Sequence, residues 1–130
     1  MIMLDTNVCS YIIKGQSPWA SRFTSGDTKE MAISAIVAYE LELYKQRAAP
    51  DGALAQLIAS FLRTIRIVPF EADAAAIAAA SASALLDKER RIGAFDVLIA
   101  AHAMTERAVL VTNNGKDFMA IKGLNFATSL

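Results

Sequence analysis

The sequence predicts a single α/β domain with a small, mostly parallel sheet covered by helices. Two observations favour this fold class. Short apolar runs, typical of buried strands, alternate along the chain with longer segments of helical periodicity, as expected of βαβ units. The 130 residues are enough to bury a core of their own. Because neither a repeat nor a linker interrupts the pattern, we interpret residues 1–130 as one domain.

Local signals divide the chain into elements. Gly15 is placed to stop the first helix, Pro18 opens the second and Ser34 caps the third. The strands are expected at residues 1–4, 31–34, 65–70, 109–111 and 124–127. The helices are expected at residues 8–14, from 18 onward, and at 34–47, 53–63, 71–86, 94–107 and 116–121.

The composition excludes several classes of protein. Every apolar run is far shorter than the ~20 residues that a membrane-spanning helix needs, and no charged segment precedes the apolar start, so we expect a cytoplasmic protein. One histidine and one cysteine, Cys9, leave too few ligands for zinc and no internal disulfide. Thirteen basic and thirteen acidic residues cancel, so the net charge does not indicate nucleic-acid binding.

Apolar residues beyond the core could form a partner surface. Hydrophobic residues make up 55% of the chain and the mean hydropathy is +0.36, which leaves room for exposed apolar area. Trp19 and Phe23 lie four residues apart on one helical face, and we interpret them as core, with a partner surface as the alternative. His102, in mid-helix, is expected to be packed or partly exposed instead of a catalytic base.

Four acids occupy unusual settings. Asp5 ends the first strand and Asp117 lies in the turn after the fourth, and functional crevices of α/β sheets lie outside the carboxyl ends of strands. Asp96 begins an almost wholly apolar helix, and Glu40 is expected to face inward. Helix capping is the alternative explanation for Asp96 and Asp117.

The helix at residues 34–47 determines the interpretation of Glu40. At about 100° per residue, Glu40 falls near the middle of an apolar arc while Glu42 points the opposite way. The expected arc consists of Ile36, Val37, Leu43 and Tyr44. A buried carboxylate needs a partner, which is either a functional cleft or an ion pair with Arg22 or Arg66.

Four converging carboxylates require a cation, because like charges raise each other's pKa. Hard oxygen ligands without a histidine or cysteine cluster favour Mg²⁺ or Mn²⁺, and such an ion makes phosphodiester hydrolysis the expected reaction. Polar residues near the acids are expected to orient them or a water, with turn chemistry as the alternative: Asn7, Thr112, Asn113 and Asn114. Arg90 and Arg91 are candidates for contacting a phosphate backbone, or they end a solvated helix.

Four ordered motifs carry a family resemblance. The stretches MLDTN, AYELELY, IGAFDVLIAAHA and AVLVTNNGKDF together resemble a PIN domain, specifically the VapC family of toxins from bacterial toxin-antitoxin pairs. The resemblance implies a PIN-like three-layer α/β/α fold and Mg²⁺- or Mn²⁺-dependent endoribonuclease activity. It implies that Asp5 and Asp96 bind metal, with Glu40 and Asp117 completing the acidic pocket. It further implies a cytoplasmic homodimer whose cognate antitoxin covers the cleft.

The chain departs from the commonest family pattern at Asn114, where many relatives have aspartate. The fourth acid must then be Asp117, or Asn114 acts as a neutral ligand or donor. Two other functions are weighed against a ribonuclease. One is a non-catalytic PIN-like binding module that acts through a protein partner. The other is a haloacid-dehalogenase-like phosphatase, which wants a second aspartate at the position of Asn7.

Overall fold

A five-stranded parallel sheet forms the centre of the molecule. The computed structural model describes residues 1–130. Every neighbouring pair of strands is parallel, and the strand order is β3-β2-β1-β4-β5. The strands are β1 (Ile2–Leu4), β2 (Met31–Ser34), β3 (Arg66–Val68), β4 (Val109–Val111) and β5 (Phe126–Ala127). The predicted fold class is confirmed.

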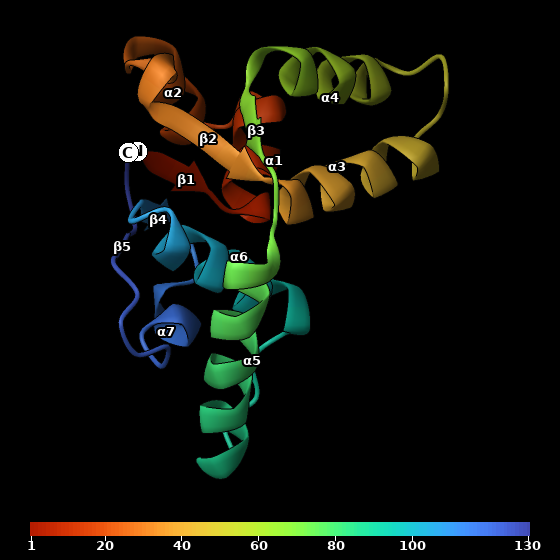
Figure 1. Cartoon of the computed structure of the whole chain (residues 1–130). Coiled ribbons are helices and arrows are strands. Elements are labelled where there is room, and N and C mark those ends of the chain that lie inside the picture. The colour runs from red at the N-terminus through yellow and green to blue at the C-terminus, as the bar shows by residue number, and fades with distance from the viewer.

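Helices cover both faces of the sheet in a three-layer α/β/α arrangement. In Figure 1 the first four helices lie on one side of the strands and the last three on the other, as right-handed crossovers require. They are α1 (Thr6–Ile13), α2 (Trp19–Ser25), α3 (Ala35–Arg47), α4 (Ala53–Thr64), α5 (Ala72–Asp87), α6 (Ala94–Thr105) and α7 (Gly115–Phe118), with a 3₁₀ turn η1 at Thr28–Glu30. None of these helices combines the length and the apolar character needed to cross a membrane.

The local signals act as expected. Gly15, just past the end of α1, has φ +71°, a conformation that strains residues with a Cβ. The Ser34 hydroxyl accepts a hydrogen bond from the Ile36 backbone N–H at 3.0 Å and so caps α3. The turn η1 was not predicted. It begins where the Asp27 carboxylate accepts from the Lys29 N–H.

The aromatic residues of α2 pack inward. Trp19 is buried and stacks on Tyr11, with ring centroids 6.4 Å apart. Phe23 is partly buried against Phe61 at 5.9 Å. Cys9 is fully buried and unpaired. The interpretation of Trp19 and Phe23 as core residues is confirmed.

The apolar arc predicted on α3 is wrong in its second half. Val37 is buried, but Leu43 and Tyr44 are 42% and 43% exposed. Figure 1 shows the reason: α3 and α4 form an antiparallel pair that projects beyond the sheet. The later turns of α3 therefore have no sheet to cover, and helical periodicity alone does not reveal where the core ends.

Candidate functional site

Asp5 lies at the carboxyl end of β1, in the centre of the sheet. Its Oδ1 accepts from the Val8 N–H at 2.9 Å and caps α1, while its Oδ2 accepts from the hydroxyl of Thr112, which directly follows the adjacent strand β4. Asp5 is only 4% exposed. Burial raises the pKa of Asp5, the hydrogen bonds from Thr112 and Val8 oppose this rise, and the charge of Glu40 adds to it.

Glu40 projects from α3 towards the same end of the sheet. The Thr6 hydroxyl donates to Glu40 Oε1 at 2.7 Å, and Glu40 makes no ion pair with Arg22 or Arg66. Glu42, by contrast, is exposed and pairs with Lys45 at 2.8 Å. The prediction that Glu40 faces inward while Glu42 is solvated is confirmed, and the alternative of an ion pair between Glu40 and an arginine is wrong.

Asp117 and Asn114 occupy the start of α7 together. The Asn114 side-chain amide donates to Asp117 Oδ2 at 2.9 Å, and its backbone N–H donates to Thr112 Oγ1 at 2.9 Å. The Arg90 guanidinium donates to Asp117 Oδ1 at 3.1 Å. The two residues left open by the sequence are therefore hydrogen-bonded partners, and Arg90 adds a positive charge beside them.

Asp96, in the first turn of α6, lies close enough to the other three acids for their charges to raise its pKa. Burial, followed by the charges of Asp5, Glu40 and Asp117, raises its pKa to about 6. No hydrogen bond opposes this rise. A carboxyl that merely capped its helix would be favoured in its ionised form, so capping does not explain Asp96.

The four carboxylates interact but are not drawn together around a common point. No group of three or more His, Cys, Asp or Glu side chains is arranged to hold one ion. Charges interact over several ångström, whereas Mg²⁺ coordinates oxygen at about 2.1 Å, so these two observations are compatible. The donor set itself consists of hard carboxylate oxygens and suits Mg²⁺ or Mn²⁺.

The remaining predicted residues lie at the margin of this site. The Asn113 amide donates to the Tyr11 hydroxyl at 3.2 Å, and no hydrogen bond joins its side chain to any of the four acids. Asn7 is exposed, and its backbone, not its side chain, acts on Asp5. Arg91 is exposed beside Arg90, and both line an apolar groove between α5 and α6.

Two residues near the acids were not singled out from the sequence. Thr6 holds Glu40, and Tyr44 lies close enough to the acids that, after burial, the charges of Glu40 and Asp96 raise its pKa. Tyr44 follows Glu40 by four residues on α3, a spacing that places both on one helical face. That spacing could have identified Tyr44 as a residue of the acid site, whereas nothing in the sequence marks Thr6 except its position directly after Asp5.

Comparison with known proteins identifies the family. The family model described as PIN domain matches residues 2–124. The tRNA(fMet)-specific endonuclease VapC of Shigella flexneri is 31% identical over 123 residues, which span 94% of this chain and 92% of the relative. Ribonuclease VapC2 of Rickettsia felis is 34% identical over 124 residues, with the same coverage.

A solved structure agrees over nearly the whole fold. The crystal structure of VapBC2 from Rickettsia felis bound to a DNA fragment from their promoter superposes with a TM-score of 0.87 at 34% identity, covering 98% of each chain. The fold and the matched length thus agree with the same assignment. The chain belongs to the PIN-domain family and, within it, to the VapC group.

Proposed function

We propose that this chain is the toxin of a type II toxin-antitoxin pair and acts as a Mg²⁺- or Mn²⁺-dependent endoribonuclease. The raised pKa of Asp96 carries the proposal, because burial and then the charges of Asp5, Glu40 and Asp117 raise it, as expected of a functional site at the carboxyl end of a parallel sheet. The names of the relatives, a tRNA(fMet)-specific endonuclease and a ribonuclease, support RNA as the substrate.

Each acid has a distinct role in this proposal. Asp5 and Asp96 hold the metal ion, and Glu40 and Asp117 flank it and orient the attacking water. Bound Mg²⁺ or Mn²⁺ would supply a water of lowered pKa and stabilise charge on the scissile phosphate. Thr112, Thr6 and Asn114 hold Asp5, Glu40 and Asp117 respectively through the hydrogen bonds described above.

Arg90 and Arg91 are proposed to contact the RNA backbone. Arg90 lies against Asp117, so its guanidinium places positive charge at the margin of an otherwise acidic site. A phosphate approaching the acids would meet this charge, which reduces the repulsion between substrate and site.

Cleavage of purified RNA in defined metals tests the proposal. We expect cleavage with Mn²⁺ or Mg²⁺, none after EDTA treatment, and none in Asp5→Asn at any metal concentration. Expression of the chain should arrest growth of the host, and Asp5→Asn should relieve the arrest. Metal-independent cleavage, or full activity in a folded Asp5→Asn variant, would contradict the assignment.

A cognate antitoxin and a second copy of the chain are the proposed partners in the cytoplasm. VapBC complexes among the structural neighbours support the antitoxin. A groove of about 280 Å³ between α1, α3 and α4 is suited to binding the antitoxin, because Tyr44 lines the groove and lies near the acids.

Exposed Leu86, which lines the groove between α5 and α6, is suited to dimer contact. Light scattering of the wild type and Leu86→Glu tests the dimer.

A non-catalytic PIN-like module acting through a partner is the second candidate. The lack of three acids arranged to hold one ion favours it. Calorimetric titration with Mn²⁺ separates the two functions. If the chain binds no Mn²⁺ and cleaves no RNA, the non-catalytic module is favoured.

A further inference from the structure

Two of the five buried polar residues lie outside the acid site and contact each other. Asp5, Thr6 and Thr112 belong to the hydrogen bonds around the carboxylates. The other two, Ser34 and His102, are 0% and 1% exposed, and His102 Nδ1 lies 2.7 Å from Ser34 Oγ. Buried polar groups are costly unless paired, so this pair calls for a physical reason.

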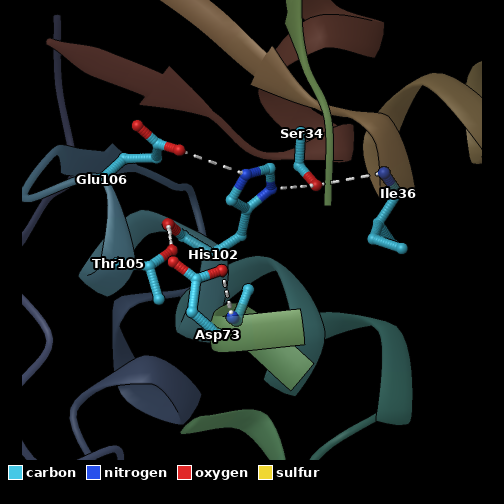
Figure 2. Close-up of polar contacts among 7 residues, drawn as sticks. Ser34, Ile36, Asp73, His102, Thr105 and Glu106 are labelled. Carbon is cyan, nitrogen blue, oxygen red and sulfur yellow. Dashed lines mark hydrogen bonds and ion pairs between the residues drawn. The ribbon is translucent and has the colours of Figure 1, made fainter. Parts of the chain in front are cut away.

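The pair joins the two helices that carry Glu40 and Asp96. Ser34 ends β2 and caps α3 through the Ile36 N–H, whereas His102 comes from the middle of α6 (Figure 2). It is the only side-chain hydrogen bond between α6 and the β2–α3 segment. Continuing the register of Met3 with Ala32 places Ser34 level with Asp5 on the neighbouring strand.

The hydrogen-bonding pattern determines the tautomer of His102. Ser34 Oγ already accepts from the Ile36 N–H, so its hydroxyl hydrogen is free to be donated to Nδ1. The hydrogen of the imidazole is then on Nε2, which faces the Glu106 carboxylate at 3.8 Å without forming a hydrogen bond (Figure 2). The opposite assignment would leave the buried Ser34 hydroxyl hydrogen without an acceptor.

The surroundings keep the imidazole neutral. Burial lowers the pKa of His102, and the charges of Glu106, Asp73 and Glu71 together with the Pro69 backbone act in the opposite direction. Phe70 contacts the ring edge-on, with centroids 5.3 Å apart. A neutral ring is the form in which Nδ1 can accept from Ser34.

We infer that His102 is a positioning residue that fixes α6 to the start of α3 and thereby sets the placement of Asp96 relative to Glu40. Each acid lies six residues from the bond along its own helix, a rise of about 9 Å. A hydrogen bond at this point fixes how far one helix slides along the other. Displacements of about 1 Å in a catalytic constellation lower rates up to about 100-fold. This inference rests on the proposed ribonuclease function.

The first test needs no activity. His102 is the only histidine in the chain, so its imidazole ¹⁵N resonances are unambiguous. At pH 7.5 we expect Nε2 protonated and Nδ1 unprotonated. The Nδ1-protonated tautomer would overturn the hydrogen-bond direction on which the inference depends. In His102→Leu, the backbone amide resonances of Glu40 and Asp96 should shift, and unchanged resonances at both would contradict a positioning role.

The second test measures RNA cleavage. His102→Leu keeps the volume but not the acceptor, and we expect kcat to fall about tenfold with KM changed less than about twofold. His102→Asn offers an acceptor in place of Nδ1 and should restore kcat to within about threefold. Thr105→Val is the matched control, since its hydroxyl bonds only the His102 backbone carbonyl on the same helix.

The outcomes separate this inference from the proposed function. If His102→Leu and His102→Asn lose kcat equally, in proportion to a fall in Tm, the role of His102 is purely structural and the inference is overturned. If the wild type cleaves no RNA, the ribonuclease assignment fails, but the tautomer and the amide resonances still decide whether His102 positions the two helices.

Discussion

Helices α5 and α6 each carry an aspartate in the first turn, and the two aspartates differ in burial and in the charges around them. Asp73 of α5 is exposed, and its carboxylate accepts from the adjacent Ala74 N–H at 2.8 Å. Asp96 of α6 is half-buried and feels three other carboxylates. In the same local position, the carboxylate of Asp73 stabilises its helix, whereas the surroundings of Asp96 destabilise its ionised form. A carboxyl with a pKa raised in this way is expected at a functional site.

The largest expected difference between these aspartates is in RNA cleavage. Asp96→Asn removes a proposed metal ligand and should lower kcat/KM about 1,000-fold, because metal-assisted charge stabilisation is lost. Asp73→Asn should stay within about twofold of the wild type. Kinetics on one RNA substrate with Mn²⁺ measure both. Similar losses in the two variants would remove the distinction between the helices.

A smaller loss is expected when the support of an acid is removed. Thr112→Val keeps the shape of the side chain but removes the donor to Asp5, and outer-shell partners of this kind contribute about 10-fold to metal affinity or rate. Thr64→Val is the matched control, because its hydroxyl bonds only carbonyls of its own helix. Calorimetric Mn²⁺ affinity together with kcat gives the comparison, and a Thr112→Val variant equal to the control would contradict it.

The two arginines after α5 should differ as well. Arg90→Gln removes the cation paired with Asp117 and should raise KM for RNA about fivefold, with a shallower salt dependence. Arg91→Gln, at an exposed position without an ion pair, should raise KM about twofold. Both effects are measured by determining KM for RNA at several salt concentrations. A larger effect at Arg91 would move the proposed RNA path away from Asp117.

The smallest expected effect is on stability, and it has opposite signs at the two aspartates. The folded pKa of Asp96, about 6, lies above its ordinary value of 3.8, so ionisation destabilises the fold as pH rises through this window. Asp96→Asn should therefore raise Tm by about 4 °C above pH 6, corresponding to about 1 kcal/mol after allowance for solvent screening. The gain should vanish below pH 3.8.

Asp73→Asn should instead lower Tm by about 2 °C at neutral pH, because a negative charge near a helix N-terminus is stabilising. Thermal unfolding in EDTA at several pH values between 3.5 and 7.5 covers both variants. A drop in Tm for Asp96→Asn at neutral pH would mean that its carboxylate stabilises the fold, contrary to the raised pKa.

Most of the fold could be predicted because its signals are local. Ser34 caps α3, Gly15 ends α1 with a positive φ, and the apolar runs form strands within a few residues of their expected bounds. The exposed Leu43 and Tyr44 escaped prediction, because how far a helix pair projects beyond the sheet depends on packing between distant segments.

The order of strands and helices, the resemblance to the family and the choice of four candidate acids all came from the amino-acid sequence, since each depends on residue types and motifs along the chain. The hydrogen-bond partners of those acids and of His102 depend instead on the folded structure. Thr6 on Glu40, Thr112 on Asp5, Arg90 on Asp117 and Ser34 on His102 join residues between 27 and 107 positions apart. Hydrogen bonds over such separations form only once the sheet brings its carboxyl ends together, and no local pattern encodes them.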